Sequence, residues 1–192
     1  TYKMVTALAA LQDGKITPNE TVYCPGHYQL GNRRFHCWKR GGHGSVDLNR
    51  SLVESCDVYY YDVAQRVGID RISEVANELG LGIRHELPMS GIAEGLAPTR
   101  AWKEVRRGES WQQGDTLNAT IGQGFTLASP LQLAVMTARL ASGKAVTPRL
   151  VKSMGGTDVP VEAAPDLPFD REWLRLIDKA LYDTVNGRSG TA

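Results

Sequence analysis

Three polar residues in two separate stretches have the side chains that acyl-transfer chemistry requires. Ser55 and Asp57 flank a cysteine in the segment ESCDVYYYDVA, and Lys3 stands in the first turn of a predicted helix. A serine hydroxyl becomes a nucleophile when a neighbouring base accepts its proton, and an unprotonated lysine amine is such a base. A serine three positions before Lys3 would share its helix face, and that position directly precedes Thr1. These residue types would allow acyl transfer through a serine, with Lys3 as the base.

Each of these residues also has a structural interpretation that the sequence leaves open. A lysine in the first turn of an apolar helix is usually a surface residue whose aliphatic stem lies along the protein. A Ser-x-Asp triplet between two helices is often a helix cap, with Asp57 ahead of Val58. The catalytic interpretation depends on Lys3 and the triplet occurring together with the further segments described below.

Three thiols and an imidazole form a second group of interest. The cysteines are Cys24, Cys37 and Cys56, and His43 lies between the last two. Three thiolates and one imidazole complete the tetrahedral shell of Zn²⁺ and leave no open position, as in structural sites. The spacing Cys-x12-Cys-x5-His-x12-Cys differs from a zinc knuckle, so its specificity is low. We expect one structural zinc ion, with Cys56 anchoring the backbone of the triplet.

Two alternatives to this ligand set stay open. His27 or His36 could replace His43 on composition alone. In an oxidising compartment cysteines usually form disulfides, so Cys24 and Cys37 could pair and leave Cys56 buried. The odd number of cysteines argues against a disulfide framework and favours zinc.

The elements that must position these groups are mainly helices. Apolar residues at three- and four-residue steps from Met4 to Leu11 predict a first helix, which Gly14 ends. Residues 16–48 are expected to form a long irregular loop, which is usually functional or held by another group. The rest of the chain is predicted to contain a helical run capped by Asp47 or Asn49, helices over 58–67 and 70–80, a loop over 81–100, a short helix and glycine-rich turn over 102–125, a helix from the cap Ser129 to Gly143, a strand over 145–154, and a last helix capped by Asp170.

Composition indicates one globular domain without affinity for polyanions. The 192 residues are 42% hydrophobic and include 22 basic and 21 acidic side chains, for a net charge of +1. This balance gives no signal for nucleic-acid binding. No run of apolar residues is long enough for a membrane span. The chain begins inside an amphipathic helix and shows little strand, so we expect a fragment cut at both ends, with any main sheet outside it.

Several segments resemble those of the penicillin-binding transpeptidases, a class of serine acyltransferases that also contains serine β-lactamases. They are GHGSVDLNRSLVESCDVYYYDVAQRVGIDRI and TIGQGFTLASPLQLA, together with Lys3. That class uses Ser-x-x-Lys, Ser-x-Asn and Lys-Thr-Gly motifs. The resemblance covers nearly the whole chain and is strongest to penicillin-binding protein 2, the elongation-specific class B group of Gram-negative bacteria. Asp57, where most relatives carry asparagine, and the stretch WQQGDTLNATIGQG indicate this group.

The resemblance implies an α/β transpeptidase fold, an antiparallel sheet flanked by helices, of which this chain supplies mostly the helical part. It implies D,D-transpeptidation: the serine before Thr1 attacks the D-Ala-D-Ala amide of a peptidoglycan stem peptide, and an amine from a neighbouring stem resolves the acyl-enzyme. Lys3 would be the base for acylation, Ser55 would relay protons, and Asp57 would fix the substrate amide. Some relatives are thought to hold a metal at positions matching the cysteine cluster, often with aspartates as ligands.

The resemblance also implies ligands, partners and a location. Stem peptides and β-lactams would be the ligands, and a membrane glycosyltransferase and the rod-shape elongation complex would be the partners. The protein would act at the periplasmic face of the bacterial inner membrane, with its anchor outside this segment. Residues 1–192 would be a partial transpeptidase domain that starts just after the nucleophilic serine and ends before the Lys-Thr-Gly strand.

Two glycine-containing stretches are left out of the catalytic set. The final GRSGTA resembles the third motif, but that motif lies on a strand, whereas YDTVNG predicts a helix end and turn. We therefore exclude Arg188 and Ser189. The stretch 122–124, Gly-Gln-Gly, is given a structural role, because glycine pairs mainly mark tight turns.

Two other functions are considered. A β-lactamase or D,D-carboxypeptidase of the same fold would need a group that activates water against the acyl-enzyme, and no residue is placed for it. A non-catalytic β-lactam sensor or zinc-stabilised module would have something other than serine before Thr1. The identity of that one residue separates the second alternative from an enzyme.

Overall fold

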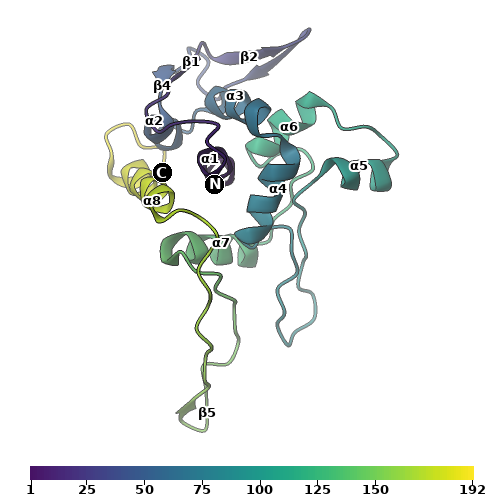
Figure 1. The fold of residues 1–192 in the computed structure, drawn as a ribbon, viewed down its shortest axis with the longest axis vertical. Helices are drawn as coiled ribbons and strands as arrows, with labels where there is room; N and C mark the ends of the chain where they lie inside the picture. Colours follow the sequence, from purple (N-terminus) through teal and green to yellow (C-terminus); the bar gives the residue numbers. More distant parts are fainter.

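The computed structural model describes residues 1–192, which form a group of helices with three small sheets at its edges (Figure 1). The helices are α1 (Lys3–Gln12), α2 (Leu48–Val53), α3 (Asp57–Val67), α4 (Ile69–Glu78), α5 (Arg100–Arg107), α6 (Gln113–Thr120), α7 (Pro130–Ser142) and α8 (Arg171–Asn186). The strands are β1 (Val22–Cys24), β2 (His27–Leu30), β3 (Arg33–His36), β4 (Gly44–Val46), β5 (Ser153–Met154) and β6 (Thr157–Asp158). Each sheet has only two strands, so the regular secondary structure is mostly helical, as predicted. None of its helices combines the length and the apolar character that crossing a bilayer demands.

Helix α1 lies in the middle of this group, in contact with α3, α4 and α8 (Figure 1). All its residues from Lys3 to Leu11 are buried, although the sequence predicts an amphipathic helix. The alanines at positions 7, 9 and 10 explain the difference, because small side chains let neighbours approach on every side. The buried hydroxyl of Thr6 donates to the Thr120 carbonyl at 3.2 Å and accepts from the Thr120 hydroxyl at 2.7 Å. These bonds fix α1 against the end of α6.

Residues 22–46, here called the β-arm, contain two nested antiparallel ladders instead of the predicted irregular loop. β1 pairs with β4, which places Cys24 opposite Gly44. β2 pairs with β3, which places His27 opposite His36. Ladders of three and four residue pairs are too short to show an alternating hydrophobic pattern, so the sequence did not reveal them. The nesting brings Cys24, at the end of β1, close to Cys37, which directly follows β3.

Most predicted helix caps are confirmed. Asp47, not Asn49, caps α2 by accepting the N–H of Arg50 at 2.8 Å. Ser129 caps α7, with proline at the first helical position and a left-handed glycine at the end. Asp170 caps α8.

The strand predicted over residues 145–154 is wrong. Only Ser153–Met154 is in a ladder, and it pairs with Thr157–Asp158 in a small exposed hairpin. Pro148 has no N–H to donate to a ladder. The segment also lies at the opposite end of the molecule from the other two sheets (Figure 1). Its apolar residues therefore do not order it as a strand.

Candidate active site

Ser55 occupies the turn between α2 and α3 with a left-handed backbone. Its φ is +53°, and no other non-glycine residue in the chain has a positive φ. The N–H of Ser55 donates to the Leu52 carbonyl at 3.2 Å, and the N–H of Cys56 donates to the Ser51 carbonyl at 2.9 Å. These two bonds end α2 in a Schellman motif, whose left-handed position glycine usually fills. A side chain kept in such a conformation by its surroundings is common at functional sites.

Lys3 reaches this turn from the first turn of α1. Its Nζ donates to Ser55 Oγ at 2.8 Å and to the Ser55 carbonyl at 2.7 Å. It also forms an ion pair with Asp57 Oδ1 at 2.7 Å, and the two side chains are only 11% and 13% exposed. Three acceptors therefore match the three N–H donors of the ammonium group. The interpretation of Lys3 as a surface residue is wrong.

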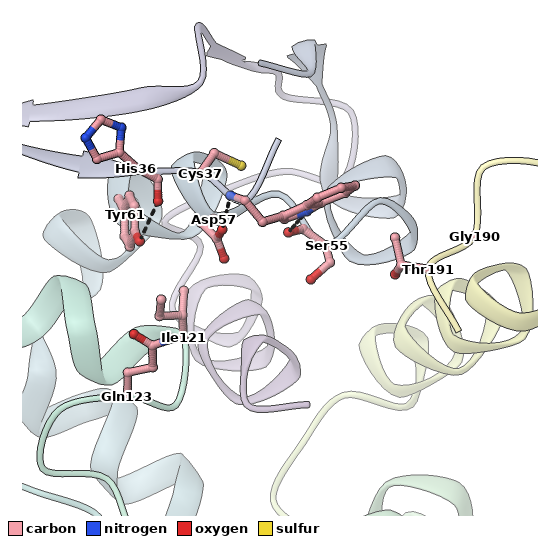
Figure 2. Close-up of a pocket in the computed structure, with 10 residues that line it drawn as sticks. His36, Cys37, Ser55, Asp57, Tyr61, Ile121, Gln123, Gly190 and Thr191 are labelled. Atoms are coloured by element: carbon pink, nitrogen blue, oxygen red, sulfur yellow. Dashed lines mark hydrogen bonds between the residues drawn. The ribbon is translucent and has the colours of Figure 1, made fainter. Parts of the chain in front are cut away.

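Asp57 is the first residue of α3 and not its cap. The cap position is Cys56, which makes no side-chain capping bond. The second carboxylate oxygen of Asp57 accepts the backbone N–H of Trp38 at 2.9 Å (Figure 2). The helix-cap interpretation is therefore wrong for this side chain, which instead joins the β-arm to Lys3.

Lys3 links Ser55 and Asp57 in an arrangement whose chemistry could include proton transfer. A hydrogen bond of 2.8 Å allows a proton to pass between the lysine amine and the serine hydroxyl. Asp57 holds the lysine through charge and the β-arm through a backbone bond, so both partners keep their places. Lys3 therefore contacts both of the side chains that the sequence predicts to act with it.

A cavity of about 920 Å³ opens in front of this group. Figure 2 shows Ser55 and Asp57 on one side of it, with Ile121 and Gln123 on another. Ten residues line the cavity: His36, Cys37, Trp38, Ser55, Asp57, Tyr61, Ile121, Gln123, Gly190 and Thr191. The cavity is large enough for a peptide segment or a small ligand.

Trp38 is a site residue that sequence reasoning missed. Its indole Nε1 donates to the carbonyls of Glu54 and Ser55, both at 3.0 Å. Its backbone N–H donates to Asp57, so one residue of the β-arm holds both ends of the triplet. The available signal was a tryptophan directly after a candidate metal ligand, and nothing in the sequence shows that it contacts the triplet.

The glycine-rich stretch 122–124 has the structural role predicted for it, with one addition. Gly122 has a φ of +78°, and a Cβ there would lie 2.8 Å from Tyr2 Cβ, so no larger residue fits. This close approach places Gln123 in the wall of the cavity. Gln123 was not in the predicted site.

As predicted, the GRSGTA segment does not form a strand. Arg188 and Ser189 do not line the cavity. Gly190 and Thr191 do line it, which the sequence did not indicate. The Thr191 hydroxyl donates to the Val53 carbonyl at 3.0 Å, which attaches this segment to the end of α2.

The four predicted metal ligands form one buried cluster. The ligand atoms of Cys24, Cys37, His43 and Cys56 lie within 4.8 Å of one another. His43 Nδ1 lies 3.6 Å from Cys24 Sγ and 3.5 Å from Cys37 Sγ. A tetrahedral zinc ion, with Zn–S near 2.3 Å and Zn–N near 2.0 Å, sets nitrogen–sulfur separations of about 3.5 Å. The cluster therefore fits a zinc ion.

The alternatives to this cluster are not found in the structure. His27 and His36 lie outside it. Cys24, Cys37 and Cys56 are all buried free thiols, without a disulfide between them.

The surroundings of Cys37 favour its thiolate. A hydrogen bond from the Cys56 thiol lowers the pKa of Cys37 to about 5 against the effect of burial, helped by the backbone N–H groups of Lys39 and Asp57. The same hydrogen bond, together with burial, raises the pKa of Cys56. One proton is thus held between these two sulfurs, and metal binding would displace it.

Comparison with known proteins identifies a family. The sequence matches the family described as penicillin binding protein transpeptidase domain over residues 1–192. The peptidoglycan D,D-transpeptidase MrdA of Haemophilus influenzae is 39% identical, over 100% of this chain and 31% of its own length. MrdA of Escherichia coli K12 is 35% identical, over 100% of this chain and 32% of its own length. The chain spans about a third of the length of these curated relatives.

Solved structures agree with the sequence matches. Pseudomonas aeruginosa PBP2, in complex with WCK 5153, superposes with a TM-score of 0.92 at 38% identity, over 100% of this chain and 43% of that one. Helicobacter pylori PBP2, in complex with MreC, gives a TM-score of 0.88 at 32% identity, over 99% of this chain and 35% of that one. These matches confirm the predicted fold and the resemblance to penicillin-binding protein 2. The chain belongs to the family of penicillin-binding protein transpeptidase domains.

Proposed function

We propose that this chain is part of a peptidoglycan D,D-transpeptidase that cross-links stem peptides during cell-wall elongation. The observation that carries the proposal is the contact of Lys3 with Ser55 Oγ at 2.8 Å and with Asp57 at 2.7 Å, at the wall of an open cavity. The names of the relatives, peptidoglycan D,D-transpeptidase and PBP2, support it.

The proposed reaction divides the work among three residues and a nucleophile outside the sequence. In the parent protein, Lys3 in its neutral amine form accepts the proton of a serine before Thr1, and the serine oxygen adds to the carbonyl of the D-Ala-D-Ala amide. The C–N bond breaks, and the departing D-Ala amine takes a proton that Ser55 relays from Lys3. An amine from a second stem peptide then attacks the ester carbonyl. The new C–N bond forms the cross-link, the C–O bond to the serine breaks, and the proton lost by the amine returns to the serine oxygen. Asp57 fixes the substrate amide and the network around it.

The test is covalent labelling of the full-length parent protein by fluorescent penicillin. Lys3→Ala is expected to abolish labelling, because no neighbouring base remains to activate the hydroxyl. Lys15→Ala is the matched control, since this exposed lysine lies just beyond the other end of α1. Full-rate labelling of the Lys3→Ala protein would remove Lys3 from the mechanism. A residue other than serine before Thr1 would exclude acylation altogether.

We also propose that Cys24, Cys37, His43 and Cys56 hold one structural Zn²⁺. The support is the buried cluster, its nitrogen–sulfur distances and the lowered pKa of Cys37. When bound, the ion would supply folding free energy and no chemistry of its own, because four protein ligands leave no open position. Cys56 directly follows Ser55, so the cluster holds the backbone of the triplet against the β-arm.

The location and partners of the parent protein are proposed by similarity to its relatives. We place it at the periplasmic face of the inner membrane, where stem peptides and β-lactams are accessible. The solved complex of Helicobacter pylori PBP2 with MreC and a solved peptidoglycan synthase complex support partners from the elongation machinery, including a glycosyltransferase. Co-purification of the full-length protein with its own MreC homologue from detergent extracts would test this, and separate elution of the two would contradict it.

A further inference from the structure

A cavity of about 330 Å³ lies where α5 faces the end of α3 and the start of α6 (Figure 1). Its walls include Gln65 from α3, Arg100 and Glu104 from α5, and Trp111 from the loop before α6. None of its lining residues lines the cavity beside Ser55, the active-site cavity. This separate site, here called the α5 cavity, has the volume of a pocket for one small ligand.

The wall of the α5 cavity that contains Trp111 is held in place from several sides. Lys103 is buried on α5 and forms an ion pair with Asp115 on α6 at 2.7 Å, which holds the two helices together. The indole Nε1 of Trp111 donates to the Thr116 hydroxyl at 2.8 Å, and its ring packs on Phe125 with centroids 6.3 Å apart. The indole is therefore fixed before any ligand arrives, which lowers the cost of binding.

Two polar side chains of the α5 cavity have no partner within the protein. Gln65 Nε2 is buried and makes no hydrogen bond. The ion pairs of α5 involve only Arg100 and Lys103, so Glu104 has no charged partner. A buried donor without an acceptor is costly, and a ligand that supplies the acceptor removes this cost. The cavity thus offers a donor and an acceptor for a polar ligand.

The chemistry of the α5 cavity favours a neutral ligand with an apolar face. Arg100 and Glu104 carry opposite charges, so the lining has no net charge that would select an ion. A sugar ring has C–H groups on its faces and hydroxyl groups at its edge, which suit an indole ring and polar side chains respectively. An N-acetylated amino sugar adds an acetamido carbonyl, which is the acceptor that the Gln65 amide lacks.

The α5 cavity and the active-site cavity border the same face of α3. Tyr61 lines the active-site cavity and Gln65 lines the α5 cavity, and residues four positions apart lie on one face of a helix. At a rise of 1.5 Å per residue, the two positions are about 6 Å apart along the helix axis. Different parts of one polymeric substrate can therefore contact the two cavities at the same time.

We propose that the α5 cavity binds an N-acetylated amino sugar, with the sugar ring against Trp111 and the acetamido carbonyl at Gln65. The inference deepens the proposed function and rests on it, because the glycan strands of peptidoglycan consist of such sugars and carry the stem peptides. The cavity positions a glycan strand beside α3 while a stem peptide occupies the active-site cavity. It takes no part in the acyl transfer itself.

The experiment measures binding of two uncharged trisaccharides to the full-length protein by saturation-transfer NMR, in a detergent without a sugar headgroup. Chitotriose consists of N-acetylglucosamine and carries no peptide, and maltotriose has the same number of rings without acetamido groups. We expect saturable binding of chitotriose and roughly tenfold weaker binding of maltotriose, the effect of one hydrogen bond. Gln65→Met should remove this preference without lowering the melting temperature, because it replaces a buried unpaired donor by an apolar group of similar size.

A second pair of variants tests the acceptor in the α5 cavity. Glu104→Gln should weaken chitotriose binding by several-fold, because a neutral amide is a weaker acceptor than a carboxylate. Glu172→Gln is the matched control, since this exposed carboxylate lies on another helix, α8, and lines neither cavity. Labelling by fluorescent penicillin should be unchanged in these variants, because none of the three residues lines the active-site cavity.

The outcomes separate the sugar site from the proposed function. A wild-type protein that does not bind chitotriose, or that binds maltotriose equally well, overturns the sugar site. A Gln65→Met protein that keeps the preference overturns it too, and so does equal weakening by Glu104→Gln and Glu172→Gln. A wild-type protein that binds chitotriose but does not react with fluorescent penicillin would instead contradict the proposed function.

Discussion

Ser55 combines the hydroxyl that acyl transfer requires with a backbone conformation that favours glycine. Its φ of +53° is strained for any side chain, and the Lys3 and Trp38 donors on its carbonyl oppose relaxation. A residue selected only to end α2 would be glycine. The strain therefore indicates that the hydroxyl has a function besides the turn.

This strain predicts opposite effects on stability and activity at position 55. The free energy of unfolding of Ser55→Gly should exceed that of Ser55→Ala by about 1 kcal/mol, because glycine adopts a positive φ without strain. Ser55→Gly should therefore unfold at a higher temperature. Both variants should be acylated by penicillin more slowly, by a factor on the order of 10²–10⁴, since both lose the proton relay. Thermal unfolding and labelling rates measure the two effects separately. Normal labelling of Ser55→Gly would show that the residue serves only the turn.

At the scale of elements, the site depends on contacts between the β-arm and the α2–α3 turn. The sequence pointed to Lys3, Ser55 and Asp57 through its resemblance to the transpeptidases, and the structure brings Lys3 into contact with the other two. The sequence was sufficient for most helix caps, because capping is a local interaction. It was insufficient for Trp38 and Gln123, whose roles come from tertiary contacts that leave no periodic signal. The short ladders of the β-arm were missed for the same reason.

Trp38→Phe tests the contact between these elements. Phenylalanine keeps an aromatic ring but loses the Nε1 donor to the Glu54 and Ser55 carbonyls. We expect penicillin acylation to slow roughly tenfold, the effect of losing hydrogen bonds that position the turn, with a smaller change in melting temperature. Trp102→Phe on α5 is the matched control, because its ring packs on Phe125 and does not line the active-site cavity. Equal rates for both variants would mean that the Trp38 indole does not position Ser55.

At the scale of the whole molecule, the site is built from segments that are far apart in the chain. Lys3 comes from the buried central helix, Trp38 from the β-arm, Ser55 from the turn between α2 and α3, and Asp57 from the start of α3. The core around α1 holds the lysine, whereas the β-arm contributes few buried apolar residues besides its cysteines, namely Phe35 and Val46. The Cys24, Cys37, His43 and Cys56 cluster is where the β-arm joins α3, so we expect the order of the arm to depend on metal.

Metal removal from the full-length protein should therefore affect stability and activity together. Elemental analysis is expected to give about one zinc per chain, as a single four-ligand site requires. Chelation, or Cys24→Ser, should lower the melting temperature, because metal binding contributes folding free energy. Both treatments should also slow penicillin acylation, since Cys56 lies between Ser55 and Asp57.

The control for this prediction is the neighbouring residue Tyr23. Its side chain is 68% exposed on the same strand, so Tyr23→Ser changes β1 without touching the cluster and should leave zinc content and acylation unchanged. The metal proposal would be contradicted by protein that contains no zinc and whose thiol assay shows a Cys24–Cys37 disulfide. Zinc loss in Cys24→Ser with an unchanged acylation rate would keep the metal site but separate it from the triplet. The β-arm would then be stabilised by zinc, while Lys3 and the Trp38 hydrogen bonds alone would position Ser55.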